Sequence, residues 1–217
     1  MSTRHRVAQE RQARMELILD SAEKLFVAKG YSETSINDIA EDADFSRTSL
    51  YQYFNSKEEM YIGILERYTD LLIEGVTRAT AAASATPDKI KAFLEAMRQM
   101  KDENPSFFEL YFIQRHQVEP RLSPQLRTIL NAKRRTLENV FRDFYRRGAE
   151  RGEVREIRAK DASNLFFAQV TGMMLLHQYY EEEFDVTLDE HLDKSLQMYL
   201  EFVEKKSGNT NRHRNDE

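Results

Sequence analysis

The side chains best suited to chemistry form one short polar run between residues 46 and 54. Leu50 and Phe54 stand four positions apart, so on a helix they share one buried face. The remaining positions of that helix then carry exposed hydrogen-bonding groups, which are Arg47, Thr48, Ser49, Tyr51 and Gln52. Arginine can bind guanine through two hydrogen bonds, and glutamine can bind adenine in the same way. The pattern therefore predicts an exposed helical face of hydrogen-bonding side chains.

A second helix must come directly before this one to support it. Apolar residues recur at helical spacing between residues 36 and 43, and Ser35 stands where an N-cap is needed. Asp44 and Phe45 interrupt the pattern, and aspartate tolerates the left-handed conformation of a sharp corner. Ser46 is placed as the N-cap of the next helix. Two short helices joined in this way predict a helix-turn-helix whose second helix enters the major groove.

Lys57 follows at the start of the next predicted helix, where Ser56 and Glu59 have the spacing of a capping box. Because a helix N-terminus carries partial positive charge, a lysine beside it is suited to bind a phosphate. Phosphate contacts fix the register of a protein on DNA without choosing the sequence.

This stretch resembles the DNA-binding motif of the tetracycline-repressor (TetR) family of transcriptional regulators. The family pattern has a Thr-rich helix start, then I-A, A-G-V-S and L-Y-x-(H/Y)-F-x-x-K. The matching residues here are Thr34-Ser35, Ile39-Ala40, Ala43 to Ser46, Leu50 to Phe54, and Lys57. Asp44 departs from the usual glycine, and Thr48 stands at a position that is often small. The resemblance covers roughly residues 10 to 75, with a boundary error of a few residues.

The resemblance implies a set of DNA-binding residues. Base edges are then read by Arg47, Thr48, Ser49 and Gln52, joined by Asn37, while phosphates are bound by Tyr51, Tyr53 and Lys57. We add Ser35 at the start of the supporting helix, and Arg4 and Arg6 of a basic N-terminal arm. Such an arm can reach phosphates or the minor groove, but it is equally well read as an ordinary solvated tail.

The composition limits the possible classes. The chain has 217 residues, no cysteine, only four prolines and seven glycines, and a net charge of −5. The absence of cysteine excludes disulfides and cysteine-ligated zinc and is typical of a cytoplasmic protein. The N-terminus lacks a signal peptide's apolar region, and no apolar run approaches the ~18 residues of a membrane helix. An acidic protein can still bind DNA through a local basic surface, so we expect the acidic residues between 33 and 44 to face away from DNA.

The periodicity along the rest of the chain predicts an all-α protein of about nine helices, with no strand and no repeat. We expect a flexible basic arm at 1–9, a three-helix helix-turn-helix domain at 10–55, a helical bundle for ligand binding and dimerisation at 56–206, and a disordered tail at 207–217. Cap, proline and glycine signals mark most of the helix ends, as at Gly30, Pro87, Pro105, Pro124 and Gly152.

The bundle is rich in aromatic and methionine side chains, which suit an adaptable apolar pocket as well as plain core packing. Resemblance to the family implies an effector site here, and we expect a small hydrophobic or aromatic effector and no cofactor. The candidate pocket residues are Phe93, Phe107, Phe108, Tyr111, Phe112, Phe141, Phe144, Tyr145, Phe166, Phe167, Met173, Met174 and His177. His177 and Glu181 are spaced for a metal, but no third ligand is evident, so no metal site is predicted.

The last two predicted helices carry apolar residues on more than one side, which favours pairing with a second copy across a two-fold axis. The alternative is that these helices lie at the centre of a monomer. The resemblance implies the dimer, with an interface of four helices. The candidate interface residues are Phe167, Val170, Met174, Leu192, Leu196 and Tyr199.

These features together predict a homodimeric repressor that binds a pseudo-palindromic operator and is released by its effector. An enzyme would need a nucleophile and base, or a set of metal ligands, at a convincing spacing, and the sequence has neither. A helical interaction protein is the third class, and salt-sensitive binding to its own upstream DNA would exclude that as the main role.

Overall fold

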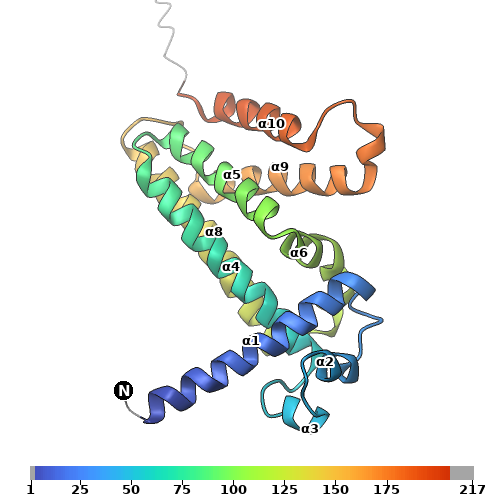
Figure 1. Ribbon diagram of the computed structural model, residues 1–217. Helices are drawn as coiled ribbons and strands as arrows, with labels where there is room; N and C mark the ends of the chain where they lie inside the picture. Colours follow the sequence, from blue (N-terminus) through green and yellow to red (C-terminus); the bar gives the residue numbers. More distant parts are fainter. Residues whose placement is uncertain (1–2, 206–217) are drawn as a thin grey trace, which may run out of the picture. The chain divides into compact units, whose positions relative to one another are not determined.

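The computed structural model describes residues 3–205, and the regular structure among them is entirely helical (Figure 1). The all-α prediction is therefore confirmed. The elements are α1 (Thr3–Lys29), α2 (Ile36–Asp42), α3 (Arg47–Leu50), α4 (Lys57–Ala82), α5 (Thr86–Glu103), α6 (Pro105–Phe108), the π-helix η1 (Glu109–Gln114), α7 (Arg115–Val118), the 3-10 turn η2 (Glu119–Arg121), α8 (Pro124–Glu150), α9 (Ala159–Tyr180), the 3-10 turn η3 (Glu181–Glu183) and α10 (Leu188–Val203). The predicted tail at 207–217 lies outside the described residues.

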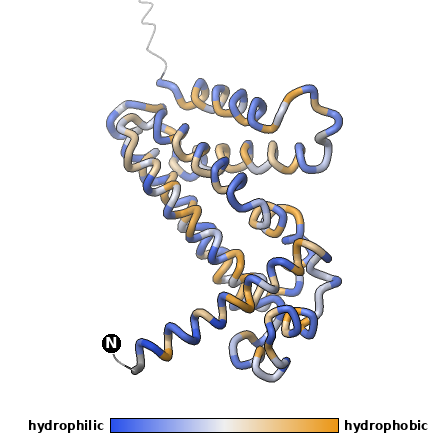
Figure 2. The backbone as a smooth tube through the Cα atoms, in the orientation of Figure 1, coloured by the Kyte–Doolittle hydropathy of each residue, from blue (hydrophilic) through white to orange (hydrophobic). Residues whose placement is uncertain are grey.

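Where helices follow one another without a break, as from α6 to η2, they form one continuous segment, and the described residues then contain nine. This count agrees with the predicted number of helices. Figure 2 shows hydrophobic and hydrophilic residues interspersed along these helices. Within residues 3–205, no helix combines the length and apolar character needed to cross a membrane.

Helix α1 begins at Thr3, so residues 3–9 are helical although they lack apolar periodicity. That residues 1–9 form a flexible basic arm stays a prediction. Residues 5–9 are exposed, so they need no apolar stripe, and arginine, glutamine and alanine among them favour helix. An ion pair between Arg6 and Glu10, at 3.6 Å, and a hydrogen bond from Gln12 to Glu16 add support one turn apart.

The described chain forms two compact units. Unit 1 comprises residues 1–78 and 94–139, and unit 2 comprises residues 79–93 and 140–217, as far as these are described. The predicted boundary at residue 55 separates functions, whereas these units reflect compactness, so the predicted division remains a prediction.

The core of unit 1 joins α1 to α4. Ile18, Ala22 and Phe26 of α1 are fully buried, as are Met60 and Ile64 of α4. These positions follow the helical spacing of the sequence, so burial of one stripe on each helix positions the segment between them, which contains the predicted DNA-reading residues.

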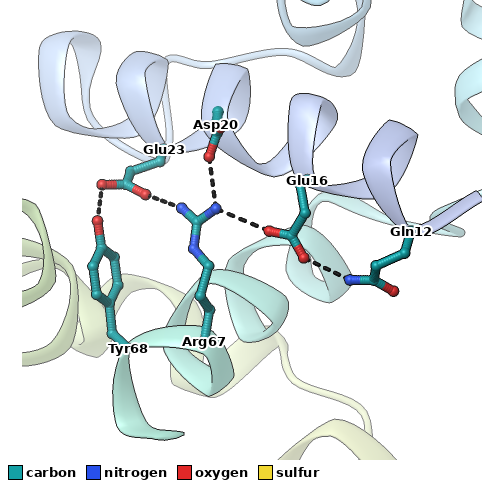
Figure 3. Close-up of polar contacts among 6 residues, drawn as sticks. All are labelled: Gln12, Glu16, Asp20, Glu23, Arg67 and Tyr68. Atoms are coloured by element: carbon teal, nitrogen blue, oxygen red, sulfur yellow. Dashed lines mark hydrogen bonds and ion pairs between the residues drawn. The ribbon is translucent and has the colours of Figure 1, made fainter. Parts of the chain in front are cut away.

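Arg67 of α4 makes the main polar connection to α1 (Figure 3). Its guanidinium lies 3.1 Å from Glu16 Oε2 and 2.6 Å from Asp20 Oδ1, and it also pairs with Glu23. Tyr68 donates a hydrogen bond to the same Glu23 carboxylate. Three acids one turn apart on α1 thus converge on a single arginine, which fixes how α1 lies along α4.

We expect Arg67→Ala to destabilise the protein, because three acids and Tyr68 Oη would lose their shared cation. A network of partly exposed pairs suggests a loss of about 1–3 kcal/mol in the free energy of unfolding. Arg67→Lys should recover only part of it, since an ammonium lacks the planar fork of donors. Urea denaturation of the parent and both variants would measure this. Equal stability of all three proteins would show that the network contributes nothing.

The core of unit 2 is aromatic. Phe93 meets Phe141 and Phe166 edge to face, with ring centroids 5.6 and 5.7 Å apart, and Phe141 stacks on Phe166 at 4.7 Å. Tyr199 Oη donates to the carbonyl of Ala162 at 2.7 Å, which joins α10 to α9. Such pairs stabilise a core beyond their buried area.

Within unit 2, the Glu153 carboxylate is hydrogen-bonded to Thr86 and Arg151. Glu153 Oε2 accepts hydrogen bonds from the Thr86 amide at 2.8 Å and from the Thr86 hydroxyl at 2.6 Å, and Oε1 accepts from Arg151 Nε at 2.5 Å. The bonds from Arg151, and then those from Thr86, lower the pKa of Glu153 to about 2. All of these bonds favour the ionised carboxylate.

The stabilisation by Glu153 should therefore depend on pH. Since its folded pKa lies below the usual 4.5, the contribution is complete above that value and is lost as the pH falls toward 2. The free energy of unfolding of the parent should exceed that of Glu153→Gln at pH 7, and the gap should narrow below pH 4.5. Urea titrations at several pH values would test this, with exposed Glu156→Gln as the matched control. A gap that stays constant from pH 7 to pH 3 would contradict the assignment.

Candidate nucleic-acid interface

The N-terminus of α2 carries the cap that the sequence predicted. The Ser35 hydroxyl accepts from the Asp38 amide at 3.1 Å, and the Asp38 carboxylate accepts from the Ser35 amide at 3.0 Å. This reciprocal pair satisfies two backbone donors at the helix start. Ser35 and Asn37 are both exposed, so their predicted contact with DNA remains open to test.

The corner after α2 is a Schellman turn with aspartate in the left-handed position. Asp44 has a φ of +59°, and it is the one non-glycine residue with positive φ in the described chain. Its amide bonds the Glu41 carbonyl at 3.2 Å, while the Phe45 amide bonds the Ala40 carbonyl at 2.8 Å. The expectation that Asp44 turns the corner is confirmed, and Phe45 is partly buried behind it.

Helix α3 presents the polar residues outward. Ser46 caps it by accepting from the Ser49 amide at 3.1 Å, and Leu50 anchors it with no exposed surface. Arg47, Thr48 and Gln52 are all exposed. Three of the five residues predicted to read base edges on or after α2 are therefore exposed in this stretch of the chain. Ser49 is partly buried, and its hydroxyl also bonds that of Ser46, at 2.8 Å.

The two tyrosines at the end of α3 differ. Tyr51 is exposed, and the Arg47 guanidinium lies 5.7 Å from its ring centroid. Tyr53 is partly buried, and its ring meets that of Phe45 edge to face with the centroids 5.9 Å apart. Arg14 Nη1 lies 3.4 Å from the Tyr53 hydroxyl. Tyr51 is thus the freer of the two to bind a phosphate.

Two arginines of α1 that were not among the predicted DNA-binding residues reach this surface. Arg11 donates to the Gln52 carbonyl at 3.0 Å, and its guanidinium lies 5.0 Å from the Tyr53 ring centroid. Arg14 contacts the Tyr53 hydroxyl. The contacts span about 40 positions in sequence, so no local pattern could have revealed them. They add positive charge beside the exposed face of α3.

For the predicted arginines Arg4 and Arg6, the structure describes little that bears on DNA binding. Arg6 is exposed and pairs with Glu10. The side chain of Arg4 lies outside the described residues.

Lys57 has protein partners that the prediction did not anticipate. Its ammonium donates to the carbonyls of Tyr31 at 2.6 Å and Thr34 at 2.7 Å, and lies 4.2 Å from the Tyr31 ring centroid. Burial lowers the pKa of Lys57. An ammonium has three donors, and two of them are used within the protein. The structure therefore gives Lys57 a role in joining the α1–α2 turn to α4, beside its predicted contact with phosphate.

The acidic residues near α2 lie partly against α1. Asp42 pairs with Lys24 at 2.5 Å, and Asp38 lies 4.0 Å from Lys29. Their negative charge is thereby partly balanced by lysines of α1, as an interface for DNA requires.

The predicted effector residues fall into two groups. Phe107, Phe108, Tyr111 and Phe112 belong to unit 1, and the other nine belong to unit 2. The unit 2 rings pack on one another, so they form a core in this structure. His177 is buried, with its Nε2 2.6 Å from Nδ1 of His191 and its ring stacked on Phe184 at 4.6 Å. Effector binding by either group remains a prediction.

The predicted dimer residues need correction. Val170, Met174, Leu192 and Tyr199 are at most 3% exposed within the single chain, so a second copy has no surface of theirs to cover. Phe167 and Leu196 are partly exposed. The exposed apolar side chains of α9 and α10 are instead Leu165, Leu176, Tyr179, Tyr180, Met198 and Phe202. The sequence showed that the last two helices carry apolar residues on more than one side. Only the packing shows which side is already buried within the chain.

The comparisons agree with this description. Residues 18–64 match the family model for bacterial regulatory proteins of the tetR family. The HTH-type transcriptional activator FasR from Mycolicibacterium smegmatis is 30% identical over 122 residues, which are 56% of this chain and 56% of that protein. The match thus spans little more than half the length of that relative. The uncharacterized HTH-type transcriptional regulator YfiR from Bacillus subtilis is 27% identical over 195 residues, 86% of this chain and 89% of that protein.

Among solved structures, the transcriptional regulator FadR from Bacillus subtilis, in complex with stearoyl-CoA, superposes with a TM-score of 0.74. It is 16% identical and covers 87% of this chain and 98% of that one, a likeness that concerns the fold. The matched residues 18–64 contain α2, the Schellman turn and the exposed face of α3. Residues 18–64 of the chain therefore carry the domain that defines the tetR family of bacterial regulatory proteins, and longer stretches are similar to HTH-type transcriptional regulators.

Proposed function

We propose that this protein is a homodimeric, ligand-responsive repressor that occupies a pseudo-palindromic operator in the cytoplasm and blocks transcription. The observation that carries the proposal is the exposure of Arg47 and Thr48 on the capped and anchored helix α3 and of Gln52 in the turn that follows it. Arg11 and Arg14 beside them supply positive charge for the flanking phosphates.

The proposed dimer forms through the exposed apolar side chains of α9 and α10. On α9, Leu165, Leu176 and Tyr179 form one exposed apolar stripe. Their spacing of 11 and 3 residues places them on the same side of the helix. Gly172 lies on that stripe, and a Cβ there would meet nothing within 4 Å. Met198 and Phe202 form the corresponding pair on α10. Exposed apolar area of this kind is typical of a protein interface.

The dimer presents two copies of α3 to DNA. Half-sites on one face of the duplex lie about 34–36 Å apart or a multiple of that. An effector that binds better when the two α3 helices are wrongly spaced lowers operator affinity by linkage.

We propose a small, largely hydrophobic effector, since the helical bundle is dense in aromatic side chains. The Bacillus subtilis structure with stearoyl-CoA makes long-chain acyl-CoA the first compound to test. Medium-sized aromatic compounds form the second group.

The proposal is tested with DNA that flanks the protein's own gene. Fluorescence anisotropy should show tight binding of a fragment with an inverted repeat, with an affinity that falls steeply as salt rises. Sedimentation should show two chains per fragment, and Leu176→Asp combined with Met198→Asp should yield a monomer that binds weakly.

Transcription in a purified system then gives the direction of control. Lower transcript from the fragment on adding the protein supports repression, and higher transcript would replace it with activation, as the name of the Mycolicibacterium relative describes. Binding that ignores DNA sequence at every salt concentration would overturn the proposed function.

A further inference from the structure

A single glutamine side chain satisfies two backbone groups where α1 ends. Gln114 Nε2 donates to the Phe26 carbonyl at 3.0 Å, and Gln114 Oε1 accepts from the Tyr31 amide at 3.0 Å. Gln114 is only 5% exposed. The Phe26 carbonyl also accepts from the Gly30 amide at 2.9 Å, whereas the Tyr31 amide donates to Gln114. A buried amide without a partner is costly. The turn after α1 therefore depends on a residue more than 80 positions away.

Gln114 reaches this turn from the π-helix η1, of which it is the last residue. A π-helical turn holds one residue more than an α-helical turn. If η1 became α-helical, residues at its end would rotate by about 100°, the share of one residue in an α-helical turn. The Gln114 amide would then no longer face Phe26 and Tyr31. Tyr111 and Phe112, which are candidate effector contacts, lie within this same π-helix.

The turn is also bound from α4. Lys57 donates to the carbonyls of Tyr31 and Thr34, and the Tyr31 hydroxyl donates to Glu58 at 2.6 Å. The next residue is Ser35, which caps α2. Figure 1 shows the segment that follows α6 beside the C-terminal end of α1. Hydrogen bonds thus connect η1 through residues 30–34 with α4, and residue 34 leads directly to the cap of α2, the first helix of the predicted DNA-reading motif.

We propose that Gln114 is a positioning residue for these helices, and that its two hydrogen bonds make their placement depend on the π-helical form of residues 109–114. A ligand that contacts Tyr111 or Phe112 then acts on DNA binding by changing this helical form. The inference rests on the proposed function for its effect on DNA, but the hydrogen bonds themselves can be tested without DNA.

The test replaces Gln114 by methionine, which is similar in size but removes the bonds to Phe26 and Tyr31 and a third bond, to Glu109 at 3.1 Å. The matched control is Gln125→Met, the same change at an exposed position of α8. Hydrogen exchange of the free protein should be about tenfold faster for residues 30–53 in Gln114→Met, while α8 remains as protected as in the parent. Affinity for the selected DNA fragment should fall about tenfold, with Gln125→Met like the parent in both measurements.

Gln114→Glu provides a second variant if the methionine protein does not fold. It keeps an acceptor for the Tyr31 amide but faces the Phe26 carbonyl and Glu109 with a carboxylate, so it should show the same localised increase in exchange. Parent-like exchange and affinity in both variants would overturn the inference, and so would an increase spread evenly over unit 1. If the parent binds no DNA while exchange at 30–53 still rises, the proposed function fails and the positioning role of Gln114 stands.

Discussion

Arg47→Ala is expected to remove discrimination at one base pair of each half-site. A bidentate contact between arginine and guanine contributes about 1–3 kcal/mol of selectivity, and a dimer makes the contact twice, so the loss reaches about 2–6 kcal/mol. Arg47 is exposed and its only described ring contact is with Tyr51, so the protein's stability should not change. Anisotropy titrations against a panel of fragments, each with one base pair replaced, would locate the affected position.

The control for this prediction is Arg135→Ala, which removes an equally exposed arginine from α8. It should leave both affinity and selectivity unchanged. Arg47 would be reassigned to phosphate binding if Arg47→Ala weakened the binding of all fragments equally and made the affinity less dependent on salt. That second pattern is what the sequence predicts for Lys57→Ala, where the structure adds a loss of stability through Tyr31 and Thr34.

Gly148→Ala is expected to have the largest effect on folding. A Cβ at Gly148 would lie 1.9 Å from Thr86 Oγ1 and 2.7 Å from Thr86 Cβ, distances that no packed structure tolerates. Thr86 is fully buried and bonded to Glu153 through both its amide and its hydroxyl, so it cannot move aside freely. We expect a loss of about 2–4 kcal/mol in the free energy of unfolding, at or above the usual range for overpacking.

Gly75→Ala is the matched control, because Gly75 is also helical but a Cβ there meets nothing within 4 Å. It should stabilise the protein by about 0.5–1 kcal/mol, as alanine favours helix over glycine. Thermal and urea unfolding of both variants would test the pair. A stability for Gly148→Ala equal to that of Gly75→Ala would mean that α8 and Thr86 are not in close contact.

Most helix ends could be predicted because their signals are local. Ser35 and Thr187 both cap helices through reciprocal bonds with a residue three positions on, and Gly30 and Gly152 both have the positive φ of a helix stop. Asn104 is an exception, since its amide bonds back to Met100 and does not cap α6. The π-helical form of residues 109–114 had no local signal that we recognised.

The DNA-reading face is the part of the site that sequence alone determined. Leu50 and Phe54 are buried and Arg47, Thr48 and Gln52 are exposed, as the spacing predicted. The predicted helix is nevertheless shorter than expected, because α3 ends at Leu50 and residues 51–53 form a turn. The corner at Asp44 followed in the same way, because few residue types adopt positive φ.

Only the tertiary structure decided which residues meet across long stretches of chain. Gln114 bonds Phe26 and Tyr31, Lys57 bonds the turn after α1, and Arg11 reaches Gln52, all between segments whose separation hides them from any local pattern. It also decided which apolar face of α9 and α10 is already covered. Periodicity reveals that a face is apolar, but the partner that buries it is chosen by three-dimensional packing, to which residues far apart in sequence contribute together.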